Sequence, residues 1–98
     1  MSAFFIGLAK IKDREAFAQY GAAYQRSFER FGGVMLARGS RVFDVVGEDG
    51  PEVSIVVWFP TMTKLEEWFN CGDYQALIPL RDKAIDLTIT AFENLNFD

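Results

Sequence analysis

Residues 59–81 read FPTMTKLEEWFNCGDYQALIPLR, and this stretch decides how the second half of the chain folds. An apolar segment ends at Phe59, and Pro60 stops the strand because proline has no amide hydrogen to give to a sheet. Thr61 or Thr63 can then cap a helix, and Thr63 has the capping-box spacing from Glu66. The helix is predicted to end at the sequence NCG.

Beyond this break the pattern predicts two short helical pieces and a strand. Asp73 can cap a turn that carries Tyr74 and Leu77. Pro79 fits the first turn of a further helix, because that position needs no amide hydrogen. Residues 87–92, LTITAF, alternate apolar residues with threonine, which indicates a half-buried strand at the edge of a sheet.

The chain before residue 34 predicts a strand and a long helix. In residues 3–11, AFFIGLAKI, both alternating sets of side chains are apolar, which is typical of a central strand that is covered on both faces. Asp13 can cap a helix over residues 14–31, where apolar residues recur at helical spacing. Gly32 and Gly33 are expected to end it.

The middle of the chain predicts two extended segments joined by a turn. Residues 34–46 are extended in character but interrupted at Gly39–Ser40, where we expect a bulge rather than a tight hairpin, because MLA at 35–37 is very short for a separate strand. The sequence EDGP at 48–51 predicts a turn. Residues 53–59, VSIVVWF, predict another strand with two apolar faces.

The resulting order is strand, helix, strand, strand, helix, strand, which predicts the ferredoxin-like βαββαβ arrangement over a single domain, residues 1–98. This α+β fold has an antiparallel sheet with its helices on one face, and its first and third strands are central. Because those strands are apolar on both faces, the uncovered face needs a partner. We therefore expect a homodimer that forms through the sheet face.

Composition excludes several classes of function. The formal net charge of −4 and the scattered lysines and arginines argue against nucleic acid and against a membrane surface as partners. No apolar run is long enough to span a bilayer, and no signal peptide is recognisable, so the expected location is cytoplasmic. The chain has no histidine and only Cys71, which excludes histidine bases, histidine-ligated haem or zinc, and intrachain disulfides. We expect no cofactor and no metal.

Two groups of residues carry a resemblance to a known family. FGG at 31–33 and LARG at 36–39 form the first group. The second consists of FPTM at 59–62, WF at 68–69, YQAL at 74–77 and Arg81. With this spacing, which covers essentially the whole chain, the sequence resembles family 1330 of domains of unknown function.

The resemblance implies a ferredoxin-like protomer in the dimeric α+β barrel superfamily. Relatives in that superfamily include cofactor-free monooxygenases, small isomerases and haem-dependent enzymes. Trp58 stands where members of the family often carry a glutamate, so a mechanism that uses this carboxylate is not carried over.

Five residues are the candidates for a site. Arg38 and Arg81 are predicted to be catalytic, since a guanidinium can stabilise charge on a carboxylate or enolate oxygen. Tyr20, Trp58 and Tyr74 are predicted to line a ligand pocket, because each combines an apolar body with a polar tip. The alternative for the arginines is a surface ion pair, and for the aromatic residues it is packing in the core or the dimer interface.

Three functions fit these residues. The first is a cofactor-independent enzyme that acts on a small organic acid or enol, with the arginines stabilising oxygen charge and a tyrosine orienting the substrate. The second is a non-catalytic dimer that binds a small metabolite in the same pocket. The third is a purely structural dimer whose cleft is filled by its own side chains.

Overall fold

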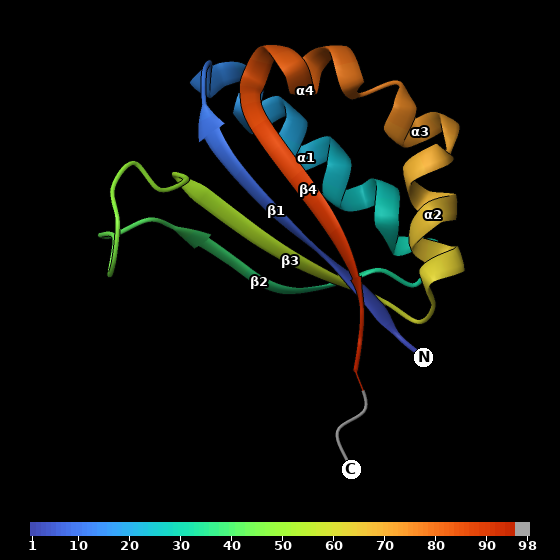
Figure 1. The fold of residues 1–98 in the computed structure, drawn as a ribbon. Coiled ribbons are helices and arrows are strands. Elements are labelled where there is room, and N and C mark those ends of the chain that lie inside the picture. The colour runs from blue at the N-terminus through green and yellow to red at the C-terminus, as the bar shows by residue number, and fades with distance from the viewer. Residues whose placement is uncertain (96–98) are drawn as a thin grey trace.

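The computed structural model describes residues 1–95, which form a four-stranded antiparallel sheet with all helices on one face (Figure 1). This is the predicted ferredoxin-like arrangement. The second predicted helical region is divided into three short helices, as the breaks at residues 71 and 77 require. The elements in chain order are β1 (Ala3–Ile11), α1 (Arg14–Glu29), β2 (Val34–Ser40), β3 (Val53–Phe59), α2 (Met62–Asn70), α3 (Gly72–Gln75), α4 (Ile78–Ala84) and β4 (Ile85–Glu93).

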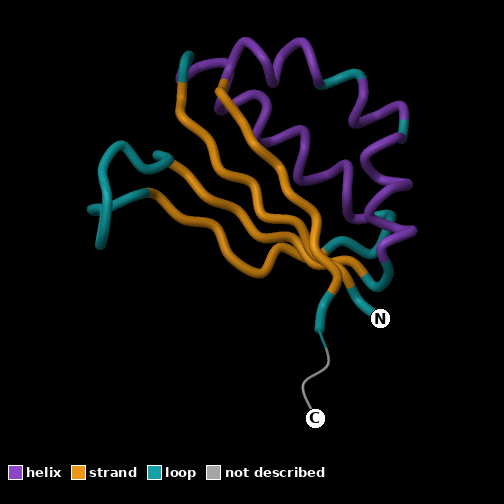
Figure 2. The backbone as a smooth tube through the Cα atoms, viewed as in Figure 1, coloured by secondary structure: helices purple, strands orange, loops and turns teal. Residues whose placement is uncertain are grey.

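The sheet has the order β2-β3-β1-β4, so β1 and β3 are central and β4 is an edge strand, as predicted. Figure 2 shows the strands as one twisted layer beneath the layer of helices. In β1, Ala3, Phe5 and Ala9 face the helices and are buried. The register places Val57 opposite Phe5, so the helix-facing set in β3 is residues 53, 55, 57 and 59.

The other face of the sheet is apolar and uncovered in the single chain. It carries the alternate residues of the central strands, and two aromatic side chains, Phe4 and Phe92, stack there with ring centroids 5.3 Å apart. Exposure along β1 rises to 41% at Leu8. The apolar residues on this face are Phe4, Ile6, Leu8, Val34, Ala37, Val56, Trp58 and Phe92.

Three of the predicted helix signals are confirmed. Asp13 caps α1, with its Oδ1 accepting a hydrogen bond of 2.9 Å from the amide of Ala16. Thr61 caps α2 by accepting from the amide of Lys64 at 3.1 Å. Pro79 lies in the first turn of α4. The first turn of a helix leaves backbone amides without a partner. Asp13 and Thr61 each accept a hydrogen bond from one of these amides, and Pro79 has no amide hydrogen that would need a partner.

Of the two threonines predicted as alternative caps of α2, only Thr61 is the cap, and the predicted cap at Asp73 was wrong. Thr63 is not a cap, because α2 has already begun at Met62 and Thr63 lies inside it. Asp73 does not cap α3 either, because it lies inside the first turn. The cap is Cys71, two residues earlier, whose Sγ accepts from the amide of Tyr74 at 3.4 Å. The carboxylate of Asp73 instead lies 3.4 Å from the guanidinium of Arg30 in an exposed pair.

The extended segment predicted over residues 34–46 was also wrong beyond Ser40. The pairing of β2 with β3 ends where Ser40 meets Val53, so later residues have no strand beside them. They form a loop, in which Arg41 donates to the carbonyl oxygen of Gly50 at 2.6 Å. The bulge exists, but it lies between Met35 and Ala37 rather than at Gly39–Ser40.

The core is a cluster of aromatic side chains between the helices and the sheet. Trp68 is its centre and is 1% exposed. Its indole stacks on Phe5 at 5.0 Å and donates from Nε1 to the Oγ of Ser27 at 2.8 Å. Among residues 1–95, no helix has the length and apolar character needed to cross a membrane.

Candidate functional site

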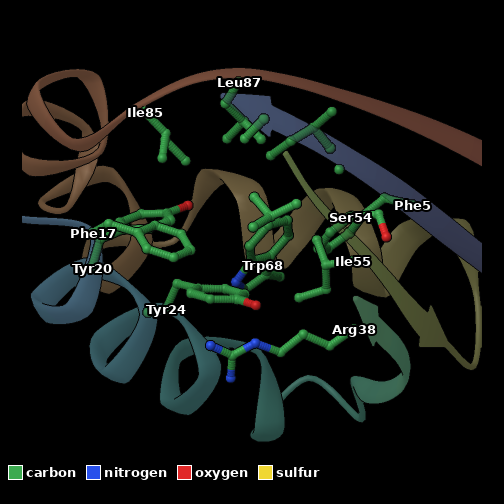
Figure 3. Close-up of a pocket in the computed structure, with 15 residues that line it drawn as sticks. Phe5, Phe17, Tyr20, Tyr24, Arg38, Ser54, Ile55, Trp68, Ile85 and Leu87 are labelled. Atoms are coloured by element: carbon green, nitrogen blue, oxygen red, sulfur yellow. The ribbon is translucent and has the colours of Figure 1, made fainter. Parts of the chain in front are cut away.

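A cavity of about 50 Å³ lies between α1 and the helix-facing side of the sheet (Figure 3). It exists there because α1 packs chiefly against α4, and α2 packs against α3, β1 and β3. This arrangement leaves part of the sheet with little helix above it. Its walls are mostly aromatic and aliphatic. The lining residues are Phe5, Gly7, Ala9, Phe17, Tyr20, Gly21, Tyr24, Arg38, Val53, Ser54, Ile55, Trp68, Ile85, Leu87 and Ile89.

Two glycines on opposite walls keep this space open. A Cβ added to Gly7 in β1 would lie 2.8 Å from the Cγ2 of Ile55. A larger residue at this position would therefore displace the side chain of Ile55, which also lines the cavity. A Cβ added to Gly21 in α1 would meet nothing within 4 Å, because it would enter open space. A glycine within a helix lowers stability relative to alanine, and at Gly21 it leaves room beside the cavity.

We expect Gly21→Ala to raise the free energy of unfolding by about 0.5–1 kcal/mol, because alanine favours the helical backbone and its methyl group meets no neighbour. Urea unfolding followed by circular dichroism would measure the change. Gly33→Ala is the matched comparison and should destabilise the fold, since its Cβ would lie 2.8 Å from the carbonyl oxygen of Phe28. Equal effects at both sites would contradict this account of Gly21.

Arg38, which the sequence predicts to be catalytic, lines the cavity from β2. It faces the helices because its register partner, Ile55, does so. Arg38 is exposed, and Figure 3 shows its side chain running along the border of the cavity beside Tyr24. Burial raises the pKa of Tyr24, and the charge of Arg38 opposes that shift. Arg38 thus supplies a positive charge at the mouth of an otherwise apolar cavity.

Tyr20, Tyr74 and Arg81 are brought together in one chain of hydrogen bonds. The hydroxyls of Tyr20 and Tyr74 are 2.9 Å apart, although these residues are 54 positions apart in sequence. Arg81 donates from Nη1 to the hydroxyl of Tyr74 at a longer 3.4 Å and from Nε to Asp82 at 3.1 Å. Tyr20 lines the cavity, whereas Tyr74 lies behind it, fully buried against Trp68.

Tyr20 is a neutral hydroxyl rather than a base. Burial, and then the neighbouring hydroxyl of Tyr74, raise the pKa of Tyr20 far above its ordinary range. The group therefore keeps its proton at any pH the fold tolerates, and it can offer that proton in a hydrogen bond.

The structure does not place Trp58 at this cavity. Trp58 alternates with Val57 and Phe59, which face the helices, so its indole lies on the uncovered face of the sheet, where its register partners are Phe4 and Val34. The three predicted pocket residues therefore do not lie in one place. Tyr20 lines the cavity, Tyr74 is buried behind Tyr20 and bonds to its hydroxyl, and Trp58 lies on the uncovered face of the sheet.

Tyr24 and Gly21 are among the lining residues that were not singled out from the sequence. Tyr24 lies one helical turn after Tyr20, and the two rings stack at 5.2 Å. That spacing was visible in the sequence as a signal for a shared helix face. Gly21 had no such signal, because a glycine within a helical pattern indicates only a locally less stable helix and does not point to a cavity. Within residues 1–95, the side chains of histidine, cysteine, aspartate and glutamate form no group that could hold a metal ion.

Comparison with known proteins identifies the family of the chain. The sequence model of the domain of unknown function DUF1330 matches residues 2–95. The chain belongs to the DUF1330 family. Among curated proteins, none matches this DUF1330 sequence.

Solved structures show the same fold at low sequence identity. A protein of unknown function from Rhodopseudomonas palustris, RPA0582, has a TM-score of 0.83 and 19% identity, with 97% of this chain and 83% of that chain covered. SnoaB, a cofactor-independent oxygenase from Streptomyces nogalater, has a TM-score of 0.72 and 7% sequence identity, with 98% of this chain and 95% of that chain covered. A dimeric ferredoxin-like protein of unknown function from Thermobifida fusca has a TM-score of 0.64 and 13% sequence identity, with 94% of this chain and 90% of that chain covered. The DUF1330 chain is thus ferredoxin-like.

Proposed function

We propose that this protein is a cofactor-independent enzyme that acts on a small organic acid or enol held in the cavity between α1 and the sheet. The observation that carries the proposal is the cavity itself, whose mostly apolar walls carry two polar groups suited to an oxygen of a ligand, the positive charge of Arg38 and the neutral hydroxyl of Tyr20; Tyr24 and Ser54 add further hydroxyls to the lining. An apolar site with a few convergent polar groups favours a ligand with an apolar body and one oxygen-bearing end. Both polar groups would stabilise negative charge on that oxygen.

The cavity limits the size of the ligand. Its volume of about 50 Å³ is roughly a third of a cavity that holds benzene, which is about 150 Å³. A molecule of a few heavy atoms would fit with little change, whereas a ring would have to displace side chains at the mouth. Arg38 is exposed and Tyr24 is only partly buried, so these two are the side chains best able to move.

Non-catalytic binding of the same kind of molecule is the second candidate, and one observation favours it. The residues that line the cavity include no aspartate, glutamate or histidine. Tyr20 cannot replace them as a base, because its pKa is raised. The enzyme therefore has to act on a molecule that loses its proton readily to water, and a molecule that does not do so would only be bound.

We also propose that the protein is a homodimer formed through the uncovered face of the sheet. The apolar residues of that face, together with the dimeric description of the Thermobifida fusca structure, support this assembly. The cavity lies on the other side of the sheet, so each protomer would carry its own site.

The test is a binding experiment with three small probes: acetylacetone, 4-nitrophenol and isovaleric acid. We expect at least one probe to shift the NMR amide signals of Gly7 and Gly21 on the two walls. Gly21→Phe should weaken that binding by about tenfold or more, because a phenyl ring would fill the open space beside Gly21. Ala22→Phe, on the exposed side of the same helix, is the matched control and should bind as the wild type does.

Two results would overturn the proposed site: none of the three probes shifts those amides, or Gly21→Phe binds as tightly as Ala22→Phe. Enzyme and binder are then distinguished by incubating the bound probe with the protein and following it by mass spectrometry. Conversion that Gly21→Phe abolishes supports the enzyme, and an unchanged probe supports the binder.

A further inference from the structure

We infer that the hydrogen-bond chain from Arg81 through Tyr74 directs the hydroxyl hydrogen of Tyr20 into the cavity, so that the site prefers ligands whose oxygen is an anion, such as a phenolate or enolate. This inference rests on the proposed function and adds the ionisation state of the ligand. It also makes Arg81 a positioning residue that acts through two tyrosines without touching the ligand.

The direction of the chain follows from what each group can donate. A guanidinium donates hydrogen bonds and cannot accept them, so Tyr74 is the acceptor in its bond with Arg81. Each tyrosine hydroxyl has one hydrogen, and the 2.9 Å bond between Tyr20 and Tyr74 uses one of the two. Whichever tyrosine accepts in that bond keeps a hydrogen to donate elsewhere.

Burial decides between the two directions. If Tyr20 donated to Tyr74, the spare hydrogen would belong to Tyr74, which is fully buried and has no other hydrogen-bond acceptor among residues 1–95. If Tyr74 donates to Tyr20, the spare hydrogen belongs to Tyr20, beside the cavity. A buried hydrogen without an acceptor is costly, so the second direction is favoured once a ligand oxygen is present.

Position supports this direction. Figure 3 shows Tyr20 extending from α1 with its hydroxyl toward the interior, on the side of Ile85. Arg38 lies at the mouth on the other side, beside Tyr24. An oxygen in the cavity would therefore meet a hydrogen-bond donor from within and a positive charge from the mouth. Both interactions strengthen when the oxygen is an anion.

The raised pKa of Tyr20 is consistent with this role, because a hydroxyl that does not ionise stays a donor. Arg81 carries a permanent charge, and its side chain is only 19% exposed where it pairs with Asp82. A charged donor at the start of such a chain polarises the hydroxyls that follow it.

The experiment compares 4-nitrophenol with 4-nitroanisole, which has the same ring and no ionisable proton. The anion of 4-nitrophenol absorbs visible light and the neutral form does not, so titration of the complex gives the pKa of the bound probe. We expect the site to bind the anion about tenfold or more tightly than the neutral form, which lowers that pKa by about one unit or more.

Three variants test the chain. Tyr20→Phe should remove most of this preference, and Tyr74→Phe and Arg81→Met should each remove part of it while 4-nitroanisole binds as before. Lys83→Met is the control, since it removes an exposed charge from the same helix and keeps Arg81, Asp82 and both tyrosines. Thermal unfolding of each variant checks that it is folded at the temperature of the titration.

Each outcome decides one point. A preference for the anion that falls in Tyr20→Phe, Tyr74→Phe and Arg81→Met supports the chain. A bound 4-nitrophenol that ionises as in water, or a preference that survives Tyr74→Phe and Arg81→Met, overturns the chain and leaves the proposed site standing. If neither nitrophenol nor nitroanisole shifts the amides of Gly7 and Gly21 and the other probes also fail, the proposed site is wrong and the chain falls with it.

Discussion

The substitution Ile6→Lys is expected to convert the proposed homodimer into a monomer. Ile6 lies in the middle of the uncovered face, between Val56 of β3 and Thr90 of β4. In a symmetric dimer through this face, both protomers would place a lysine charge in an apolar interface. At about 2 kcal/mol or more for each buried charge, the dissociation constant should rise about a thousandfold.

Sedimentation velocity at micromolar protein concentration measures this change. In the monomer the lysine would be solvated on a half-exposed strand, so circular dichroism should show an intact fold. Gln19→Lys adds the same charge on the exposed side of α1 and should remain a dimer. A wild-type protein that sediments as a monomer, or an Ile6→Lys variant that sediments as a dimer, would refute assembly through this face.

The largest loss of stability is expected from Trp68→Ala. The indole is 1% exposed and contacts Phe5, Phe59 and Tyr74, with ring centroids 5.0, 5.8 and 4.4 Å away. Removing it leaves a large cavity, and such substitutions cost about 3–5 kcal/mol. For a chain of this length that corresponds to a fall in the unfolding temperature of about 15 °C or more.

Trp68→Phe is the control, because it keeps a ring in the core and removes the hydrogen bond from Nε1 to Ser27. Its cost should be smaller, about 1–3 kcal/mol, from the lost hydrogen bond and the smaller ring. Calorimetry compares the two variants directly. If Trp68→Ala cost no more than Trp68→Phe, the indole would not be the centre of the core.

The fold was predictable because its signals are local. Asp13 and Thr61 mark the starts of helices by accepting hydrogen bonds from amides three residues further on, and Pro79 marks a first helical turn. The two apolar faces of β1 and β3 indicate that these strands are in the centre of the sheet. The end of β2 was not predictable in this way. Residues 42–46 are as apolar as a strand, but the length of the partner strand, which is a non-local property, ends the pairing at Ser40.

The site was predictable only in part, for a related reason. Both alternating sets of residues 53–59 are largely apolar, so hydrophobicity could not say whether Trp58 or its neighbours face the helices. The hydrogen bond between Tyr20 and Tyr74 depends on the orientation of α3 after Cys71. The periodicity of apolar residues does not predict that orientation. Arg38 was singled out because a guanidinium at the end of an apolar strand can bind a carboxylate or enolate, and its pairing with Ile55 places it on the helix-facing side.

The pairing of β1 with β4 also determines when the molecule can fold. These strands lie side by side for their whole length, and Asn94 donates from its amide to the carbonyl oxygen of Ser2, a residue 92 positions away. During synthesis β1 is made before β4, so one of its two edges stays unpaired until β4 has been made. Contacts of such long sequence separation make folding slow. Between the synthesis of β1 and that of β4, the nascent chain therefore presents an unpaired edge of an apolar strand to its surroundings, and this edge can pair with other chains and aggregate.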